Sequence, residues 1–245
     1  LRQGVQVIVG TPGRLNDLID RNVLRLSDVS VAVLDEADEM LNMGFREAIE
    51  TILATTPEEK VTWLFSATMP KEVAKIAERF MLNPLRISAG GENKTASNIE
   101  HVYYEVQARD RYAAIRRIID VTPNFYGIIF CRTRSETQEI ADRLISDGYQ
   151  ADSLHGDLSQ AQRDYVMKRY RSRTLQLLVA TDVAARGIDV DDITHVLHYS
   201  LPDELEVYTH RSGRTARAGK SGISAIFVSS REKRKIRDLE RIVGQ

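Results

Sequence analysis

The sequence predicts an α/β fold of two successive units, each a parallel sheet flanked by helices. Short runs of β-branched and apolar residues alternate with segments whose apolar residues recur at helical spacing, along the whole chain. A small, polar, glycine-containing stretch without any period, residues 88–98, interrupts the alternation. Because strands that alternate with helices form parallel sheets covered on both faces, we predict a first domain at residues 1–88, a linker at 89–97 and a second domain at 98–245.

The first unit is expected to contain strands with helices between them. The strand-like runs, rich in valine, leucine and isoleucine, cover residues 5–9, 31–34, 61–65 and 85–87. The helical segments cover residues 14–21, 45–53 and 70–81. Pro70 stands at the start of the last of these, where the first turn of a helix accepts proline.

The second unit repeats the same alternation over a longer stretch. Its strand-like runs cover residues 101–106, 127–131, 151–154, 177–180, 194–198 and 224–228. Its helical segments cover residues 111–119, 135–146, 160–170 and 205–212. In open parallel sheets ligands collect at the carboxyl ends of strands, so the polar residues that follow these strands are the candidates for a site.

The composition is that of a globular protein in a reducing compartment. The chain has 245 residues and one cysteine, Cys131, which excludes an internal disulfide framework and a cysteine-based zinc site. No apolar run approaches the ~20 residues needed to cross a bilayer, and residues 1–15 lack the pattern of a secretory signal. We therefore expect a cytoplasmic protein without a membrane function.

Charge is distributed unevenly along a chain whose formal net charge is −1. Such a balance argues against a uniformly basic surface, so a polyanionic partner would have to meet a local cluster. Residues 210–241 supply one, with 10 lysines and arginines against 3 aspartates and glutamates. For residues 233–241 alone, a solvated helix face is an equally good interpretation.

Carboxylates follow the predicted strand 31–34 directly, as Asp35, Glu36 and Asp38. Burying them unpaired would be costly. A carboxylate at the end of a strand can hold Mg²⁺ through water on a nucleotide, and its neighbour can orient or deprotonate an attacking water. Taken alone, the same acids also suit the N-terminus of a following helix, which favours negative charge.

Small hydroxyl residues follow the next predicted strand. Ser66 and Thr68 come directly after residues 61–65, and their hydroxyls could bond to Asp38. The alternative is a helix cap before Pro70. Both hypotheses use the same oxygen atoms, so the sequence leaves them open.

Arginines gather near the far end of the chain. Arg214 and Arg217 lie one helical turn apart, so a helix would point them to similar sides. Guanidinium groups at that spacing can clamp phosphoryl oxygens in the manner of an arginine finger, while the plain alternative is a set of surface arginines. Upstream, strand 177–180 ends in hydroxyl, glycine and carboxylate groups at residues 181–189.

Several other residues receive structural interpretations. His195 and His198 would point to opposite faces of a strand, which argues against a metal pair. Cys131 is expected to be a buried apolar residue, and Trp63 to lie in the core or an interface. Tyr103 and Tyr104 could stack on a base, although packing in the core or an interface is the first interpretation.

A series of short segments runs in order over nearly the whole chain. The segments are Thr11-Pro12-Gly13-Arg14, Asp35-Glu36-Ala37-Asp38, Ser66-Ala67-Thr68, residues 128–133, His155-Gly156-Asp157 with Gln160 and Arg163, residues 181–189, and residues 210–217. This series resembles the motifs of the DEAD-box family of ATP-dependent RNA helicases, in superfamily 2. The resemblance implies an α/β fold of two tandem RecA-like domains, the first of them truncated in this chain.

The resemblance also implies roles in ATP hydrolysis, with ATP and Mg²⁺ as cofactors. Asp35 would hold Mg²⁺ through water, and Glu36 would be the catalytic base. Arg214 and Arg217 would reach the γ-phosphate from the second domain. The residues expected to bind the nucleotide, or to join its state to domain closure, are Asp38, Ser66, Thr68, Gly187, Asp189 (on the ribose) and His210.

The implied partner is the RNA backbone. The residues expected to meet it are Thr11, Gly13, Arg14, Thr133, Gly156, Arg163, Thr181 and Gly187. Phosphate and sugar contacts carry no base sequence, so RNA binding should be independent of sequence and sensitive to salt. The implied activity is RNA-stimulated ATP hydrolysis coupled to local unwinding of an RNA duplex.

The chain departs from the family in one respect. It contains no GxxxxGK[ST] phosphate loop, and the similar stretch 213–221 has one residue too many between its glycines. We expect the chain to start inside the first domain and to hydrolyse ATP negligibly alone, because positioning is most of phosphoryl-transfer catalysis. The alternatives are an RNA-binding or regulatory module without catalysis and a DNA translocase of the same superfamily.

Overall fold

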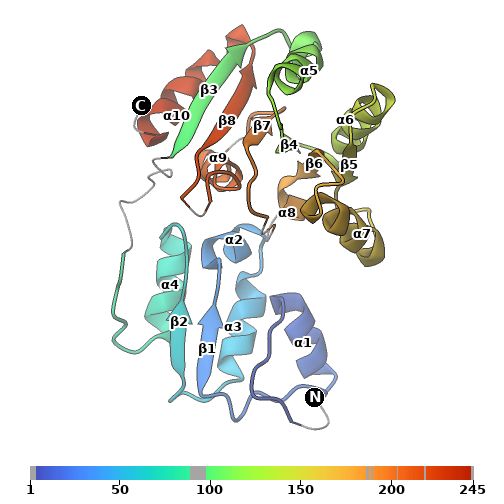
Figure 1. Cartoon of the computed structure of the whole chain (residues 1–245). Helices are drawn as coiled ribbons and strands as arrows, with labels where there is room; N and C mark the ends of the chain where they lie inside the picture. Colours follow the sequence, from blue (N-terminus) through green and yellow to red (C-terminus); the bar gives the residue numbers. More distant parts are fainter. Residues whose placement is uncertain are drawn as a thin grey trace. The chain divides into compact units, whose positions relative to one another are not determined.

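The protein is described here by a computed structural model, which covers residues 4–88, 98–185, 188, 190–202, 204–217 and 219–243. The chain divides into two compact units, Leu1–Glu92 and Asn93–Gln245 (Figure 1). The domain limits expected from the sequence stay a prediction, since the expected linker 89–97 lies outside the described residues.

Unit 1 contains a two-stranded parallel sheet and four helices among its described residues. Strands β1 (Val31–Leu34) and β2 (Val61–Leu64) pair in register, with Val31 opposite Val61 and Leu34 opposite Leu64. The helices are α1 (Pro12–Asp20), α2 (Ala37–Asn42), α3 (Arg46–Ala54) and α4 (Lys71–Phe80). Both strands and three of the helices were expected, while α2 was not.

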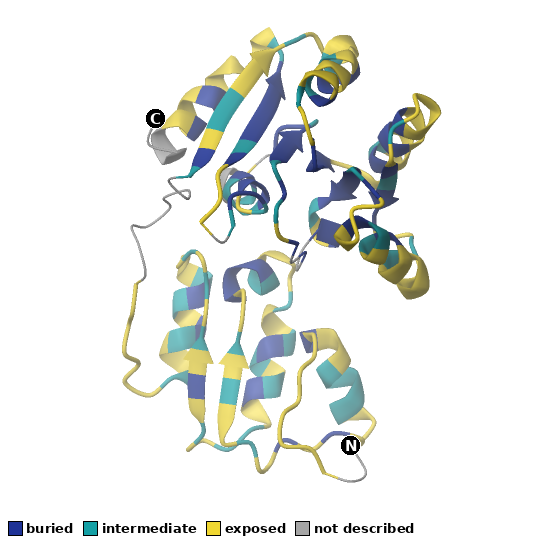
Figure 2. Ribbon diagram, in the orientation of Figure 1, coloured by how far each residue is buried: buried dark blue, intermediate teal, exposed yellow. Residues whose placement is uncertain are grey.

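The sheet of unit 1 is covered on one face. Ile49, Leu53 and Ile76 from α3 and α4 pack against Leu34 and Leu64. The opposite face carries Val31, Val33, Val61 and Trp63, whose side chains are about half exposed, at 46–53%. Figure 2 shows the resulting alternation of yellow and darker residues along β1 and β2. The expected burial of both faces is therefore wrong for this sheet within the described residues. Trp63 lies outside the core cluster, and its place in an interface stays a prediction.

Two strands expected in unit 1 do not form. Residues 5–9 and 85–87 have no strand structure, and Val9, Leu85 and Ile87 are more than four-fifths exposed, at 93%, 84% and 82%. Their apolar β-branched composition favours strands, but a strand also needs a neighbour for its backbone hydrogen bonds. The described part of the chain provides none for these segments.

Unit 2 contains a six-stranded sheet in the order β3-β8-β7-β4-β6-β5, and every described pair is parallel. The strands are β3 (Ile99–Glu105), β4 (Gly127–Cys131), β5 (Ala151–Leu154), β6 (Leu177–Thr181), β7 (His195–His198) and β8 (Gly222–Val228). The α-helices are α5 (Arg111–Val121), α6 (Arg134–Ser146), α7 (Gln160–Arg171), α8 (Asp182–Ala185), α9 (Leu205–Ser212) and α10 (Lys233–Val243). The parallel α/β fold expected from the sequence is confirmed.

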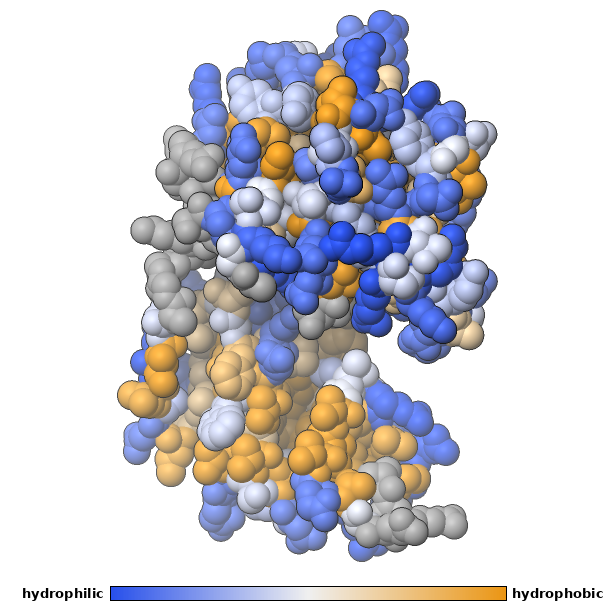
Figure 3. Space-filling model, in the orientation of Figure 1, coloured by the Kyte–Doolittle hydropathy of each residue, from blue (hydrophilic) through white to orange (hydrophobic). Residues whose placement is uncertain are grey.

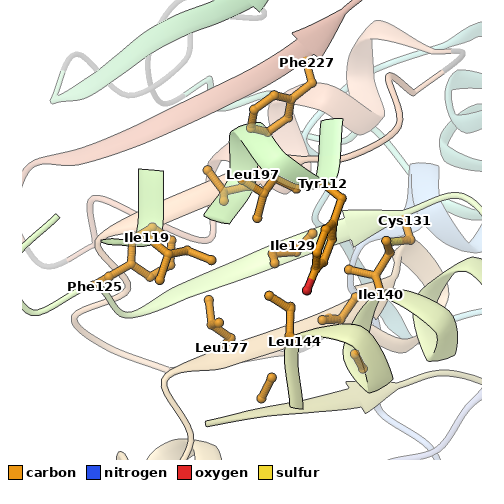
Figure 4. Close-up of a cluster of buried hydrophobic side chains, with 14 of the residues drawn as sticks. Tyr112, Ile119, Phe125, Ile129, Cys131, Ile140, Leu144, Leu177, Leu197 and Phe227 are labelled. Carbon is orange, nitrogen blue, oxygen red and sulfur yellow. The ribbon is translucent and has the colours of Figure 1, made fainter. Parts of the chain in front are cut away.

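Helices cover the sheet of unit 2 on both faces. On one face, Ile115 of α5 and Leu144 of α6 pack against Ile129 and Leu177 in the cluster drawn in Figure 4. On the other, α7 and α8 pack over β4 and β6, and α9 and α10 pack over β8. The described residues of β4 and β6 are buried throughout, as continuous apolar strands in a covered parallel sheet should be. No helix in the described parts is long and apolar enough to span a membrane.

Candidate functional site

The acidic cluster of unit 1 lies where β1 ends and α2 begins. Asp35 and Glu36 are exposed, and the amide of Glu36 donates to Asp35 Oδ1 at 3.0 Å. Glu36 adopts a left-handed conformation, with φ 52°, and serves as the N-cap of α2. That backbone costs a non-glycine residue roughly 1 kcal/mol. The following amide, of Ala37, donates to the carbonyl of Phe65 at 3.1 Å and so holds the turn against the end of β2.

Asp38 differs from its two neighbours because it is buried, with 2% exposed. Its Oδ2 accepts from the amide and from the hydroxyl of Thr68, both at 2.8 Å. The amide of Asp38 donates to Ser66 Oγ at 3.2 Å. Burial raises the pKa of Asp38, but the bonds from Thr68, Ser66 and the Glu39 amide outweigh it, so the net pKa is lowered. The expected contact of Ser66 and Thr68 with Asp38 is confirmed.

Two structural alternatives were considered for these residues: a helix cap formed by Ser66 or Thr68, and an acidic helix N-terminus. Helix α4 begins at Lys71 with Pro70 as its N-cap and no side-chain capping bond, so Ser66 and Thr68 do not cap it. The acids do occupy the N-terminus of α2, with Asp38 and Glu39 in its first turn. The helix N-terminus interpretation is therefore confirmed, while the roles of the exposed Asp35 and Glu36 in nucleotide chemistry stay a prediction.

The residues of unit 1 expected to meet RNA surround the N-terminus of α1. Thr11 is its N-cap, with no side-chain capping bond, and Gly13 lies in the first turn; both are exposed. Arg14 is exposed and pairs with Asp17 at 2.6 Å. Amide groups at a helix N-terminus offer donors and a positive potential to a phosphate, so this arrangement suits a backbone contact.

Residues of unit 2 expected to meet RNA follow adjacent strands at one edge of the sheet. Thr133 follows β4 and caps α6, accepting from the Glu136 amide at 3.1 Å, and Thr181 ends β6 beside Cys131. Gly156 follows β5 and is exposed. Arg163, on α7, donates to the Ala184 carbonyl of α8 at 3.2 Å. Because β4, β6 and β5 are neighbours, these residues share the carboxyl edge where ligands collect.

The arginine segment does not continue the helix. Helix α9 ends at Ser212, Gly213 is its C-cap, and Ala216 takes a left-handed φ of 59°. The expectation that a helical turn relates Arg214 to Arg217 is therefore wrong. Arg214 donates to the Ile188 carbonyl at 3.2 Å, and Arg217 donates back to Gly213 at 3.2 Å.

An ion pair that the sequence analysis missed holds this segment in place. Arg211 is buried, with its side chain 4% exposed, and its Nε and Nη2 donate to the two oxygens of Asp182 at 2.5 and 2.8 Å. Its Nη1 donates to the Ser200 carbonyl at 2.8 Å. The pair joins α9 to α8, so it connects the arginine segment to the loop after β6. The sequence signal was an arginine at the inward side of an amphipathic helix, which needs a buried carboxylate.

The remaining expectations concern His210, Gly187, Asp189 and the plain structural residues. His210 lies in the last turn of α9 and is half-buried. Gly187 and Asp189 lie outside the described residues. Cys131 is fully buried, as expected, and burial raises the pKa of its thiol well above the usual value.

The two histidines of β7, His195 and His198, are buried, and each has a hydrogen-bond partner in unit 2. His198 contacts Ser224 Oγ at 3.0 Å, and His195 contacts Thr194 Oγ1 at 2.8 Å. Neither His195 nor His198 belongs to a metal-binding group among the described residues. Their interpretation as structural residues of a strand is consistent with this burial.

Comparison with known proteins decides the family. Residues 1–76 match the family described as DEAD/DEAH box helicase, and residues 110–219 match the helicase conserved C-terminal domain. The solved structure of the DEAD-box protein SrmB of E. coli, bound to RraA, is 31% identical, with 86% of that chain and 60% of this one covered and a TM-score of 0.55. The chain belongs to the DEAD-box helicase family. Its paired units are RecA-like domains of that family.

Other members of the DEAD-box family match nearly the whole chain. The DEAD-box ATP-dependent RNA helicase CshA of Bacillus subtilis is 45% identical over 98% of this chain and 49% of its own length. The structure of yeast Dbp5 bound to RNA and ADP BeF3 is 29% identical, covering 98% of this chain and 64% of that one, with a TM-score of 0.90. The chain spans about half the length of the curated relatives it matches.

Proposed function

We propose that this chain functions as part of an ATP-dependent RNA helicase, in which RNA-stimulated ATP hydrolysis drives local separation of an RNA duplex. The observation that carries the proposal is the bonding of Asp38 by Ser66 and Thr68. It fixes the start of α2 and leaves Asp35 and Glu36 exposed beyond the end of β1. Asp35 and Glu36 are held at the end of a strand, while Asp38 is used in hydrogen bonds that fix the turn. This arrangement of carboxylates suits nucleotide hydrolysis.

Within this proposal the carboxylates have different tasks. Glu36 orients an attacking water and accepts its proton, because its carboxylate is exposed on a backbone that the Ala37–Phe65 bond holds still. Asp35 fits Mg²⁺, since it offers exposed oxygen ligands of the kind that this ion binds through water. When bound, Mg²⁺ would neutralise phosphate charge.

Unit 2 contributes the positive charge. Arg214 and Arg217 act on the phosphates of the bound nucleotide, and His210 responds to the state of that nucleotide. Asp189 and Gly187 serve the ribose side. The Arg211–Asp182 pair supports this role because it anchors the start of the arginine segment to α8.

RNA is held through its backbone, independently of sequence. Exposed Thr11, Gly13 and Arg14 in unit 1, and Thr133 and Gly156 at the carboxyl edge in unit 2, support this. Arg163 and Thr181 complete the set in unit 2. The compartment we propose is the cytoplasm, consistent with a single buried cysteine.

The first experiment measures RNA binding by the purified 245-residue chain. Fluorescent single strands of about 8 nucleotides and of unrelated sequence should bind with affinities within about threefold of one another, and the affinity should fall steeply with salt. Arg163→Ala should weaken binding of all of them alike. Equal affinity for DNA of the same sequence would favour a DNA translocase, and no binding of any strand would contradict the proposal.

The second experiment concerns ATP. The 245-residue chain alone should hydrolyse ATP negligibly, because it contains no phosphate loop. A chimera that adds, at the N-terminus, the part of the Bacillus subtilis relative preceding the matched region should gain RNA-stimulated hydrolysis. Glu36→Gln in that chimera should lower turnover by at least about 100-fold without weakening RNA binding. A Glu36→Gln chimera with undiminished turnover would overturn the assignment of the base.

A further inference from the structure

Helix α10 exposes most of its charged residues beside the edge of the unit 2 sheet. Ile236 and Leu239 pack against Tyr208, Ile226 and Val228, and this contact fixes which side of the helix faces the sheet. The remaining described side chains of the helix are exposed, namely Lys233, Arg234, Lys235, Arg237, Asp238 and Glu240. The helix therefore presents a charged surface to solvent rather than to the protein.

The N-terminal turn of α10 carries basic residues, although acidic residues would stabilise a helix at that position. The first turn of α10 contains no acidic residue and carries Lys233, Arg234 and Lys235. The macrodipole makes cations unfavourable at a helix N-terminus. Glu232, which precedes the helix, is already bonded to Arg111 at 2.5 Å and to the Ser229 amide at 2.9 Å. The macrodipole therefore disfavours this cluster, and of its members Lys233 is paired with Glu105. The exposed guanidinium of Arg234 suits an external anion.

Strand β3 brings an aromatic ring to the same surface. It is the edge strand of the sheet, and its register pairs Tyr103 with Ile226 and Glu105 with Val228, so these side chains share the face that α10 covers. Lys233 Nζ lies 2.7 Å from Glu105 Oε2, which neutralises that acid. Arg237 is one turn further along the helix and on the same side as Lys233.

Tyr103 and Tyr104 are adjacent in sequence but have different surroundings. The ring of Tyr104 stacks on Phe227 on the opposite face, with centroids 5.8 Å apart. Tyr103 is 51% exposed, and among the described residues its ring stacks on no other ring. An exposed aromatic ring beside basic side chains is the usual platform for an unpaired base and its phosphates.

We propose that Tyr103 and the basic face of α10, formed by Lys233, Arg234 and Arg237, are an auxiliary site for single-stranded RNA. The base stacks on Tyr103, and the arginines meet the flanking phosphates. This inference rests on the proposed function, since it extends the path of the same RNA. Three strand spacings, about 14 Å in total, separate β3 from β4, which precedes Thr133. An RNA whose nucleotides are all engaged by the proposed backbone contacts leaves none for this site, whereas a longer RNA does.

The test compares two lengths of single-stranded RNA on the purified 245-residue chain. With RNA of about 25 nucleotides, Tyr103→Ala and the double variant Arg234→Glu/Arg237→Glu should each weaken binding by about five- to tenfold. With RNA of about 8 nucleotides, both should bind within about twofold of the parent. The charge reversal should also lower the salt dependence of long-RNA binding, whereas Tyr103→Ala should leave it unchanged and Tyr103→Phe should restore affinity.

Matched variants separate this site from general charge and packing. Arg117→Glu with Arg171→Glu reverses two other exposed arginines of unit 2 and should leave long-RNA binding within about twofold. Tyr104→Ala removes the neighbouring ring from the other face and should leave binding unchanged as well. Long-RNA affinity unaffected by Tyr103→Ala, or equally reduced by the control pair, would overturn the auxiliary site. Loss of short-RNA binding in the parent would instead contradict the proposed function.

Discussion

At the scale of single residues, Asp38 shows how one buried carboxylate organises two exposed ones. Its oxygen accepts from the amide and hydroxyl of Thr68, and the amide of Asp38 donates to Ser66. These bonds join the start of α2 to the residues that follow β2. Asp35 and Glu36 are then presented from a fixed turn, so Asp38 serves by positioning and its neighbours provide the chemistry.

The first prediction concerns Asp38→Asn. Asparagine replaces one carboxylate oxygen by an NH2 group and removes the negative charge, so the amide or hydroxyl of Thr68 loses a good acceptor. Unit 1 should therefore be destabilised by about 1–3 kcal/mol. Trp63, the only tryptophan, lies in unit 1, and its fluorescence during urea unfolding reports this unit. Asp28→Asn, at an exposed aspartate of the same unit, should change stability by less than about 0.5 kcal/mol. Equal midpoints for the two variants would contradict this role.

His101 and His198 of unit 2, half-buried and buried respectively, form a second set of residues with a measurable consequence. His101 contacts the Tyr208 hydroxyl at 2.6 Å, and burial lowers the pKa of His101 to about 4. Burial, then Arg211 and His101, lowers the pKa of His198 well below its usual value. Both residues are therefore neutral in the folded state over a range where the unfolded chain takes up protons.

The second prediction follows from the sign of that difference. Because the unfolded state binds more protons, stability of unit 2 should fall as the pH drops below about 6.5, and the part due to His101 should be lost progressively down to about pH 4. Amide hydrogen exchange of β3 and β8 at about pH 7 and pH 5, corrected for intrinsic rates, measures it. His101→Gln should reduce the loss by on the order of 1 kcal/mol after allowance for partial exposure. An unchanged pH dependence in that variant would rule out His101 as the source.

At the scale of elements, the segments that carry the candidate site are connected by a few polar contacts. Arg211 of α9 bonds to Asp182 of α8 and to the carbonyl of Ser200 after β7. Its guanidinium also lies over the ring of Phe130 in β4, 5.2 Å from the centroid. One side chain therefore connects the ends of three strands.

The third prediction is that Arg211→Ala destabilises unit 2 by about 3–5 kcal/mol, because it leaves the carboxylate of Asp182 without its partner. Chemical unfolding followed by circular dichroism measures the change. The exposed pair of Arg143 with Glu139, at 3.8 Å, is the comparison, and Glu139→Ala should cost less than about 1 kcal/mol. A cost for Arg211→Ala no larger than that of the surface variant would show that the pair is dispensable.

The elements also show where periodicity succeeds and fails. Strand β4 was expected with the bounds it has, because a continuous apolar run in a covered parallel sheet gives a strong signal. Helix α2 was missed because its six residues start within the acidic cluster and give too short a period. The turn after α9 was taken for helix because nothing in its composition shows that Ala216 adopts a left-handed backbone.

At the scale of the whole chain, the two units differ in how completely they bury their apolar residues. Unit 2 covers both faces of its sheet. Unit 1 leaves Val33, Val61, Trp63 and Phe65 between 53% and 54% exposed. Figure 3 shows hydrophobic residues gathered on the visible face of unit 1, in contrast to the mostly hydrophilic surface of unit 2. Contiguous apolar surface of this kind favours association.

The fourth prediction is that the purified 245-residue chain self-associates with increasing concentration, and that Val33→Thr with Val61→Thr reduces this. Threonine keeps the β-branched shape that suits a strand and removes apolar surface. Light scattering measures association, and acrylamide quenching of Trp63 should increase as it declines. Val121→Thr, at an exposed valine of α5, is the control. A parent chain that stays monomeric at every concentration would contradict the prediction.

The sequence by itself determined the fold class, most helices and strands, and the family. Parallel strands, helical periods and an ordered series of short motifs are local patterns, and the motif residues that follow β4, β5 and β6 come to one edge because the chain order of a parallel sheet requires it. The contact of Asp38 with Ser66 and Thr68 was expected for the same reason.

Only the tertiary structure decided the partners of buried charges and the faces left open. Asp182 and Arg211 are 29 residues apart, and their pairing depends on the packing of α8 and α9. Residues 5–9 are mostly apolar and Trp63 is apolar, yet their burial depends on strands and helices placed against them. Burial and pairing are properties of neighbours brought together in space, and a local pattern specifies a residue's preference without supplying those neighbours.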